Sequence, residues 1–272
     1  MNDKFITKAR SVEFLFPYDY TAYEKFYNEF DTWIHSSSQP VAGLPGRGYI
    51  VNGITEALDQ TYSLYKKIGI FDGEYGYHEL ALPKKRLTTR LDRADCIIVS
   101  HPFSADGMSA HEKLAYADSF GKPIVVDCAF FGVCMNQSFD FTPYKNIKSV
   151  VFSLSKVFGS GWHRVGMLYT SDPYPITVPD KWSYHQLATA EKHYGLLSKV
   201  GPDSIPEYYR NEQLKICYKY NLLPSDTIIF GIDQQGILDR KFERGSINRI
   251  CISKLLEDSK PSFLSTVGLS KA

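Results

Sequence analysis

Apolar and polar positions alternate in blocks between residues 92 and 170, and this pattern predicts an α/β fold. Four short apolar runs are typical of buried strands: DCIIVSHP (95–102), PIVVDCAFFG (123–132), SVVFSLSK (149–156) and VGMLYT (165–170). The segment SAHEKLAYADSFG between the first two predicts a helix that Gly121 closes. Buried strands separated by helices are typical of a mostly parallel sheet with helices on both faces.

Helical patterns flank this central region. Aromatic residues at helical spacing predict a helix over 21–34 whose stripe faces the core or a subunit interface: Tyr20, Tyr23, Tyr27, Phe30 and Trp33. The segment TEALDQTYSLYKKIG predicts a second helix over 55–69 with Gly69 as its C-cap. Further along, helical patterns cover 181–200 and 207–223, and two late apolar runs predict strands at 227–232 and 248–253.

This layout predicts an N-terminal helical segment (1–44), a large α/β domain (45–195) and a small α+β domain (196–272). Hydrophobic residues make up 43% of the 272 positions and charged residues 22%, which is typical of a globular protein. Thirty-one basic and thirty acidic residues leave a net charge of +1, so we expect neither a nucleic acid nor an anionic membrane as partner.

The remaining composition favours a cytoplasmic protein. The N-terminal sequence MNDKFITKARSVEFLF carries charges where a secretory signal needs apolar residues, and no apolar run approaches 18 residues. The five cysteines are scattered, which suits a reducing compartment better than a disulfide scaffold. No C-x-x-C or H-E-x-x-H spacing occurs, so we expect no metal site.

The most informative run is SVVFSLSKVFGSGWHRVGMLYT, residues 149–170. It places Ser153, Ser155 and Lys156 at the end of an apolar strand, with Arg164 eight positions after the lysine. Apolar groups around a lysine remove its hydration, and a nearby cation repels its charge, so both lower its pKa. The neutral amine can then form a Schiff base. Arg164 and the Ser153 hydroxyl suit a phosphate group. A surface lysine and a structural arginine explain the same residues.

Two segments upstream carry related signals. Asp127 ends a buried strand, where a carboxylate needs a partner such as a protonated pyridine nitrogen or a neighbouring donor. Asn52, Gly53 and Thr55 stand at a predicted helix start, whose free N–H groups and dipole attract anions. A salt-bridged aspartate and an ordinary helix cap are the plain alternatives.

In this order, the motifs resemble those of the class I/II aminotransferases, the fold-type I pyridoxal-phosphate enzymes. The resemblance covers residues 45–170 well and the C-terminal third loosely. It implies that pyridoxal 5′-phosphate forms an aldimine with Lys156 and that Asp127 pairs with its ring nitrogen. It further implies a phosphate cup of Asn52, Gly53, Ile54, Ser153 and Arg164, with Thr55 as a nearby alternative. By the same resemblance, Tyr75 stacks on the cofactor and Arg249 binds the substrate α-carboxylate.

The resemblance also implies a homodimer, in which Tyr49 is a candidate to reach the neighbouring cofactor. Two positions depart from the family. Ser104, in SHPFSADG, stands where an asparagine usually contacts the phenolic oxygen of the cofactor, and Phe130 replaces the tyrosine that also contacts it. Cofactor binding tolerates these changes more readily than ordinary transamination does. Tyr77, His78 and Trp162 are candidate pocket walls.

The favoured function is therefore an aminotransferase acting on an amino acid or keto acid. Elimination, decarboxylation or racemisation on the same fold, or a non-catalytic interaction protein, are the alternatives. Ser153 and Lys156 also satisfy the S-x-x-K pattern of serine acylases, but that motif starts a helix and needs a later K-S/T-G, which is absent. The sequence contains no G-x-G-x-x-G after a strand and no Walker A motif, so nicotinamide and nucleotide cofactors have no anchor.

Overall fold

The computed structural model describes residues 21–172, 187–236, 238 and 240–268. Its centre is a seven-stranded sheet in the order β2-β9-β8-β6-β5-β3-β4. The strands are β2 (Arg47–Val51), β3 (Ile68–Gly69), β4 (Leu87–Thr88), β5 (Cys96–Ser100), β6 (Ile124–Cys128), β8 (Ile147–Ser153) and β9 (Gly166–Thr170). Neighbours from β4 to β8 pair in parallel, whereas β9 runs antiparallel to both β8 and β2. The expected mostly parallel sheet is confirmed.

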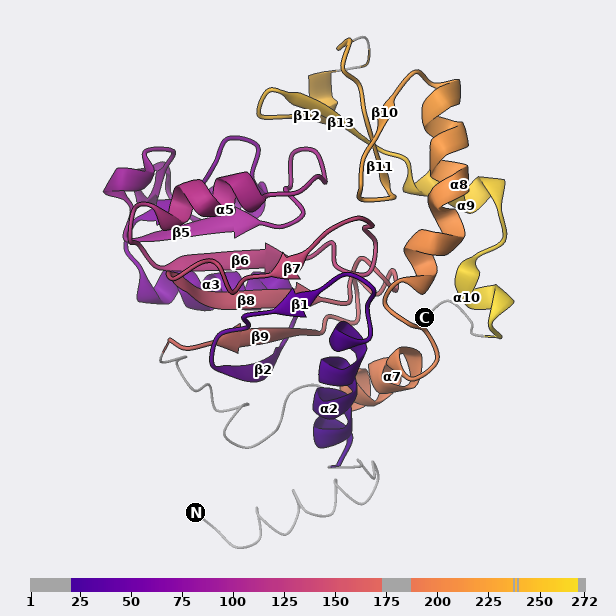
Figure 1. Ribbon diagram of the computed structural model, residues 1–272, viewed down its shortest axis with the longest axis horizontal. Helices are drawn as coiled ribbons and strands as arrows, with labels where there is room; N and C mark the ends of the chain where they lie inside the picture. Colours follow the sequence, from indigo (N-terminus) through magenta and orange to yellow (C-terminus); the bar gives the residue numbers. More distant parts are fainter. Residues whose placement is uncertain (1–20, 173–186, 237, 239, 269–272) are drawn as a thin grey trace, which may run out of the picture.

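Helices cover both faces of this sheet (Figure 1). Because side chains alternate along a strand, Ile97 and Val99 of β5 join the larger core while Cys96 and Ile98 join a second core on the opposite face. The larger core takes residues from α2 (Ala22–His35), α5 (His111–Asp118) and α7 (Leu187–Leu197), and the second takes those of α3 (Ile54–Leu64). A short parallel pair, β1 (Val41–Ala42) with β7 (Phe139–Asp140), lies outside the main sheet.

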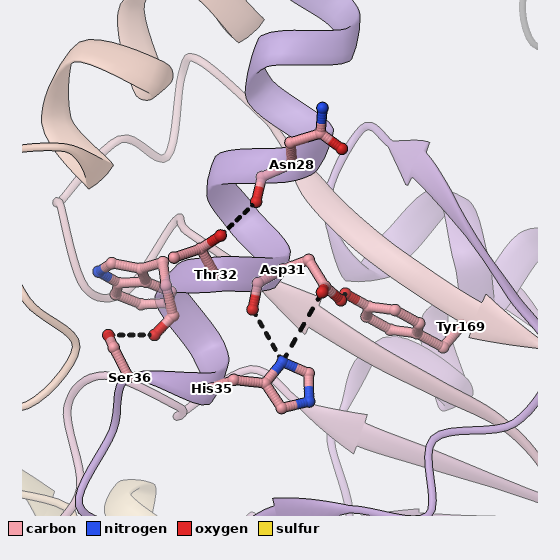
Figure 2. Close-up of polar contacts among 7 residues, drawn as sticks. Asn28, Asp31, Thr32, His35, Ser36 and Tyr169 are labelled. Atoms are coloured by element: carbon pink, nitrogen blue, oxygen red, sulfur yellow. Dashed lines mark hydrogen bonds and ion pairs between the residues drawn. The ribbon is translucent and has the colours of Figure 1, made fainter.

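Helix α2 confirms the predicted helix and shows that its aromatic stripe belongs to the core. Phe30 is fully buried, Trp33 is nearly so, and Tyr23 and Tyr27 pack against them at the edge. Figure 2 shows how the polar side of the helix is fixed: the Tyr169 hydroxyl of β9 donates to an Asp31 oxygen at 3.0 Å. Tyr20 and the N-terminal segment considered as a secretory signal lie outside the described residues.

The predicted end of the second helix is wrong. Helix α3 ends at Leu64, and Gly69 lies in β3, paired in parallel with Thr88 and Ile97. A side chain at Gly69 would come within 2.9 Å of the Ala94 Cβ atom, so glycine serves close packing here and not a helix cap. Tertiary pairing overrides the helical pattern over the last residues of the segment.

The C-terminal part forms a second, antiparallel sheet with the order β10-β11-β13-β12, beyond one end of the main sheet (Figure 1). Its elements are β10 (Leu223–Pro224), β11 (Phe230–Ile232), β12 (Glu243–Arg244), β13 (Ile247–Cys251), α8 (Ser204–Lys219), α9 (Ser253–Ser259) and α10 (Phe263–Thr266). Short helical turns complete the chain at α4 (Tyr77–Ala81), η1 (Lys84–Arg86), η2 (Leu91–Arg93) and η3 (Arg240–Phe242). The helix expected at 181–200 is described only from Leu187. The domain boundaries stay a prediction.

Candidate active site

The carboxyl ends of β5, β6 and β8 meet at one edge of the main sheet, next to the start of α3 and opposite the small sheet. This edge is where ligands bind in parallel α/β sheets. The strands end at Ser100, Cys128 and Ser153, so the residues just after them gather here. The predicted site residues come from these strand ends, from the loop after β3, from the turn between β8 and β9, from the start of α3 and from β13.

Arg164 lies against the start of α3 and forms one corner of the site with it. The Arg164 Nε donates to the Asn52 carbonyl at 3.2 Å, and its Nη2 donates to the Thr55 hydroxyl at 3.1 Å. Gly53 begins the helix with φ of 73°, and a Cβ atom there would lie 2.8 Å from Nη2 of Arg164. Glu56 accepts the Asn52 N–H at 2.6 Å, while no side chain caps α3 at Gly53. A guanidinium beside a helix N-terminus is an arrangement suited to an anion.

Asp127 lies in β6 with 3% of its surface exposed. Its carboxylate accepts the Ala129 N–H at 2.9 Å. Burial raises the pKa of Asp127 to about 7, although the Ala129 N–H and the ammonium of Lys156 both act to lower it. Asp127 and Lys156 are therefore close enough to interact electrostatically. A cationic partner would stabilise a carboxylate this deeply buried, because an unpaired buried charge costs free energy.

Lys156 lies in the turn after β8, and its surroundings correct one expectation. The predicted apolar walls do not enclose it: in the single chain its side chain is exposed. It borders a cavity of about 410 Å³ between this turn and the C-terminal helices. Ser153 is buried beside it, and the Ser153 hydroxyl accepts the Ser155 N–H at 3.2 Å.

Tyr75 lies beside Asp127 and Arg164, since the charges of both shift the pKa of its hydroxyl, although burial raises that pKa most. Its ring stacks on Tyr77 with centroids 5.9 Å apart and leaves 41% of the residue exposed. His78 lies behind this pair, fully buried, with Nδ1 2.7 Å from the Tyr62 hydroxyl. Burial lowers the pKa of His78 to about 4. His78 is thus a core residue and not the expected pocket wall.

Trp162 also fails to form a pocket wall in the single chain, because it is 97% exposed. Tyr49 lies in β2, half-buried against the α3 side of the sheet, with the Arg47 guanidinium 5.2 Å from its ring centroid. Its proposed reach to a neighbouring cofactor stays a prediction.

Arg249 projects from β13 of the small sheet toward the main one. One Nη1 hydrogen bond joins it to the Ser104 carbonyl, and its guanidinium lies 4.1 Å from the Phe230 ring centroid. Within the described part of the chain its buried Nε has no hydrogen-bond partner. Burial, together with repulsion from Arg244, lowers the pKa of Arg249 to about 10. Both arginines line a cavity of about 550 Å³, along with Ser104 and Tyr75.

Phe130 and Glu74 complete the site. Phe130 packs its ring edge-on against Phe230 with the centroids 5.1 Å apart. The phenylalanine that replaces the family's tyrosine thus makes an apolar contact with the small sheet. Glu74 is 7% exposed and lines the same cavity as Arg249, and the sequence reasoning missed it. Its only sequence signal is an acidic residue directly before Tyr75.

Comparisons with known proteins bear on the fold. No family model and no curated protein matches this chain. It is similar to a structure described as a probable N-succinyldiaminopimelate aminotransferase from Thermus thermophilus: TM-score 0.66, 14% identity, covering 88% of this chain and 82% of that one. A histidinol-phosphate aminotransferase from Sinorhizobium meliloti, in complex with pyridoxal 5′-phosphate, gives a TM-score of 0.63, 16% identity, and 92% and 83% coverage.

A PLP-bound C-S lyase from Staphylococcus hominis is similar as well, with a TM-score of 0.56, 13% identity, and 76% and 65% coverage. These similarities confirm the expected architecture. The chain has the fold-type I fold of pyridoxal-phosphate-dependent aminotransferases. In the described residues no helix is long and apolar enough to span a membrane, and no group of three or more His, Cys, Asp or Glu side chains could hold a metal.

Proposed function

We propose that this chain is a pyridoxal-phosphate-dependent enzyme acting on an amino acid or keto acid, and that it is an aminotransferase. One observation supports the proposal: on a fold shared with such enzymes, a guanidinium beside a helix start, a buried carboxyl, an aromatic ring and a lysine all lie in loops and strand ends on the same side of the main sheet. Each has a plain structural explanation by itself. Their convergence on one ligand of matching charges does not.

The residues at this edge fit the cofactor. A Cβ atom at Gly53 would fill the space at the tip of Arg164, so the backbone is kept bare where a phosphate would meet the guanidinium and the start of α3. Asp127 would hold a proton on the pyridine nitrogen, and that cation would lower the raised pKa of the carboxyl. Tyr75 would cover one face of the ring. When bound, pyridoxal 5′-phosphate supplies an aldehyde for a Schiff base and an electron sink.

Lys156 then serves as the proton carrier. Its Nζ would take the proton from the substrate Cα atom and deliver it to C4′ of the cofactor. Such a base works best shielded from water, yet Lys156 and Trp162 are both exposed in the single chain. A second copy covering this face would supply the shielding, so we propose that the active form is a homodimer.

Arg249 orients the substrate. Its buried Nε without a partner in the described part of the chain and its place on a cavity next to Tyr75 fit a guanidinium that binds a carboxylate.

A lyase reaction is the second candidate. Ser104 and Phe130 offer less hydrogen bonding to the phenolic oxygen of the cofactor than the family pattern does. The similarity to a PLP-bound C-S lyase favours elimination as the reaction to test beside transamination.

The test is direct. Protein purified with pyridoxal 5′-phosphate should show visible absorbance that borohydride removes and that Lys156→Ala lacks. Lys148→Ala, a matched change in β8, should keep the absorbance. A colourless protein that takes up no cofactor contradicts the proposal. Mixing the loaded protein with an amino-acid panel then separates transamination, which accumulates the pyridoxamine form, from elimination, which releases a keto acid without it.

A further inference from the structure

Glu74 lies in the loop after β3, immediately before Tyr75, and its carboxyl group is buried against the end of β5. Three donors converge on it: the Ser100 N–H at 2.7 Å, the Ser100 hydroxyl at 2.7 Å and the Tyr75 N–H at 3.1 Å. Burying a carboxyl group costs free energy even when it is well bonded, and a neutral side chain of the same shape would avoid that cost. Glu74 therefore calls for an explanation beyond packing.

The hydrogen bonds continue from Glu74 to Arg249. The Ser100 hydroxyl, which donates to Glu74, accepts the Ser104 N–H at 2.7 Å. The carbonyl of Ser104 in turn accepts from Nη1 of Arg249. Every donor in this series points toward Glu74, so the carboxyl group is the terminal acceptor. The N–H and C=O of Ser104 belong to two successive peptide groups, so the link through Ser104 acts by fixing the position of its backbone.

This series connects the two sheets. Glu74 and Ser100 lie at the edge of the main sheet, whereas Arg249 belongs to β13 of the small sheet. Ser104 lies in the loop that follows β5. Phe130 on Phe230 is another contact between the two parts; it is apolar, and the Arg249 guanidinium lies 4.1 Å from the centroid of the same Phe230 ring. The hydrogen bond to the Ser104 carbonyl adds a directional constraint to this stacking.

We propose that Glu74 is a positioning residue that, through Ser100 and Ser104, orients the Arg249 guanidinium for the substrate carboxylate. The inference rests on the proposed function in one respect, the role of Arg249. Glu74 acts on that carboxylate only through the other members of the series. Its effect is to fix the Ser104 carbonyl, which takes one guanidinium N–H and leaves the others for the ligand.

Glu74→Gln tests this with little change in volume. The amide can still accept the Ser100 N–H, but its NH2 group faces the Ser100 hydroxyl and the Tyr75 N–H, so the terminal acceptor is lost. Ser100→Ala breaks the series one link further on. In the cofactor-loaded enzyme, both variants should raise KM for an amino-acid substrate about tenfold, with kcat changed less than about threefold.

Asp106→Asn is the matched control. Asp106 acts on Arg249 through its charge but takes no part in the series. It accepts a hydrogen bond from the Met108 N–H at 2.9 Å, and the amide oxygen of asparagine can accept the same bond. Its KM should stay within about twofold of wild type. Unchanged KM in Glu74→Gln and Ser100→Ala, or an equal rise in Asp106→Asn, overturns the inference.

A second measurement needs no cofactor. In urea unfolding of the apo-protein, Glu74→Gln and Arg249→Lys should be non-additive, the double variant losing less stability than the two losses combined, because both break one series. Strict additivity overturns the inference even if substrate kinetics cannot be measured. If the protein binds no cofactor yet the two changes are non-additive, the proposed function fails while the coupling of Glu74 to Arg249 stands.

Discussion

Asp127 and Glu74 are neighbouring buried carboxyl groups, and burial raises the pKa of each to about 7. Because both values lie above those of an unfolded chain, the folded state holds these protons more tightly. Their stabilising contribution is present below about pH 4 and is lost as pH rises through 7. We therefore expect the apo-protein to melt several degrees lower at pH 8 than at pH 6. Thermal unfolding followed by circular dichroism measures this.

Asp127→Asn removes one of the two titrating groups and should flatten that pH dependence by roughly half. Asp92→Asn is the matched control: Asp92 is exposed and its pKa is lowered by a hydrogen bond from Arg90, so the change leaves the slope between pH 6 and 8 intact. A steep slope that persists in Asp127→Asn would assign the effect to other groups.

Phe130 tests how the departures from the family pattern act. A tyrosine there would add a hydroxyl able to bond to the phenolic oxygen of a bound cofactor, and a charge-assisted bond is worth about 1.5–3 kcal/mol. With the negative charge of that oxygen better stabilised, Phe130→Tyr should lower the pH midpoint of the visible band and raise transamination. Phe131→Tyr, one position along in the core, is the control. A lower midpoint without turnover on any amino acid would favour a non-catalytic role.

At this scale, the sequence predicted residues whose chemistry follows from local order along the chain. Lys156, Asp127 and Arg164 are predicted because each stands at a strand end or at a fixed spacing from another. Glu74 could not be found in this way, since its burial depends on Ser100 of a strand more than twenty residues further on. The exposure of Lys156 was also missed, because neighbours in sequence do not reveal whether other segments cover a side chain.

The first turn of α3 depends on the backbone of Gly53. Its φ of 73° and ψ of −173° lie in a region that only glycine adopts easily, and a Cβ atom would meet Arg164. Gly53→Ala should cost roughly 1–3 kcal/mol of stability and weaken pyridoxal-phosphate binding at least tenfold. Gly121→Ala is the matched control, because φ is also positive there but nothing lies within 4 Å of the added atom. Equal cofactor affinity in the two variants would show that the corner is not a phosphate site.

Helix α2 is held to the sheet by its aromatic face. Phe30 is fully buried with its ring 6.3 Å from that of Phe152 in β8. Phe30→Ala should lower the free energy of unfolding by about 3–5 kcal/mol, measured in urea. Glu24→Ala, on the exposed side of the same helix, should change it by less than about 0.5 kcal/mol. A small loss in Phe30→Ala would mean that α2 contributes little to the fold.

Element boundaries show where local patterns stop being informative. The strands β5, β6, β8 and β9 follow from their apolar runs, because burial on both faces leaves no other pattern. Strand β2 was missed, since its register is set by pairing with β9 across more than a hundred residues of chain. Gly69 was assigned to a helix for the same reason: its partners in β4 and β5 lie outside the local sequence.

For the molecule as a whole, the exposed Lys156 turn leads to a prediction about assembly. Trp162 is 97% exposed in that turn, and Leu80 of α4 is 86% exposed. Trp162 is the probe of the proposed homodimer because it lies in the turn that a second copy would cover to shield Lys156. Light scattering should give twice the monomer mass, and Trp162→Ser should shift the protein toward monomer and lower cofactor retention. Leu223→Ser, an exposed change in the small sheet, should leave the mass unchanged. A wild-type monomer in the presence of cofactor would contradict the prediction.

The antiparallel pairing of β8 with β9 has a consequence for how such sites are found in sequences. Ser153 pairs with Gly166, and the Leu154 N–H bonds to the Val165 carbonyl at 3.1 Å, so Lys156 and Arg164 stand near the base of one hairpin loop. The ladder fixes where the two legs of the loop begin. Ser160 is buried and its hydroxyl donates to the Leu154 carbonyl, but the stretch 161–163 is exposed and can grow by insertion without moving either leg. A search that demands an arginine eight positions after the lysine would therefore overlook chains with a longer loop and the same site.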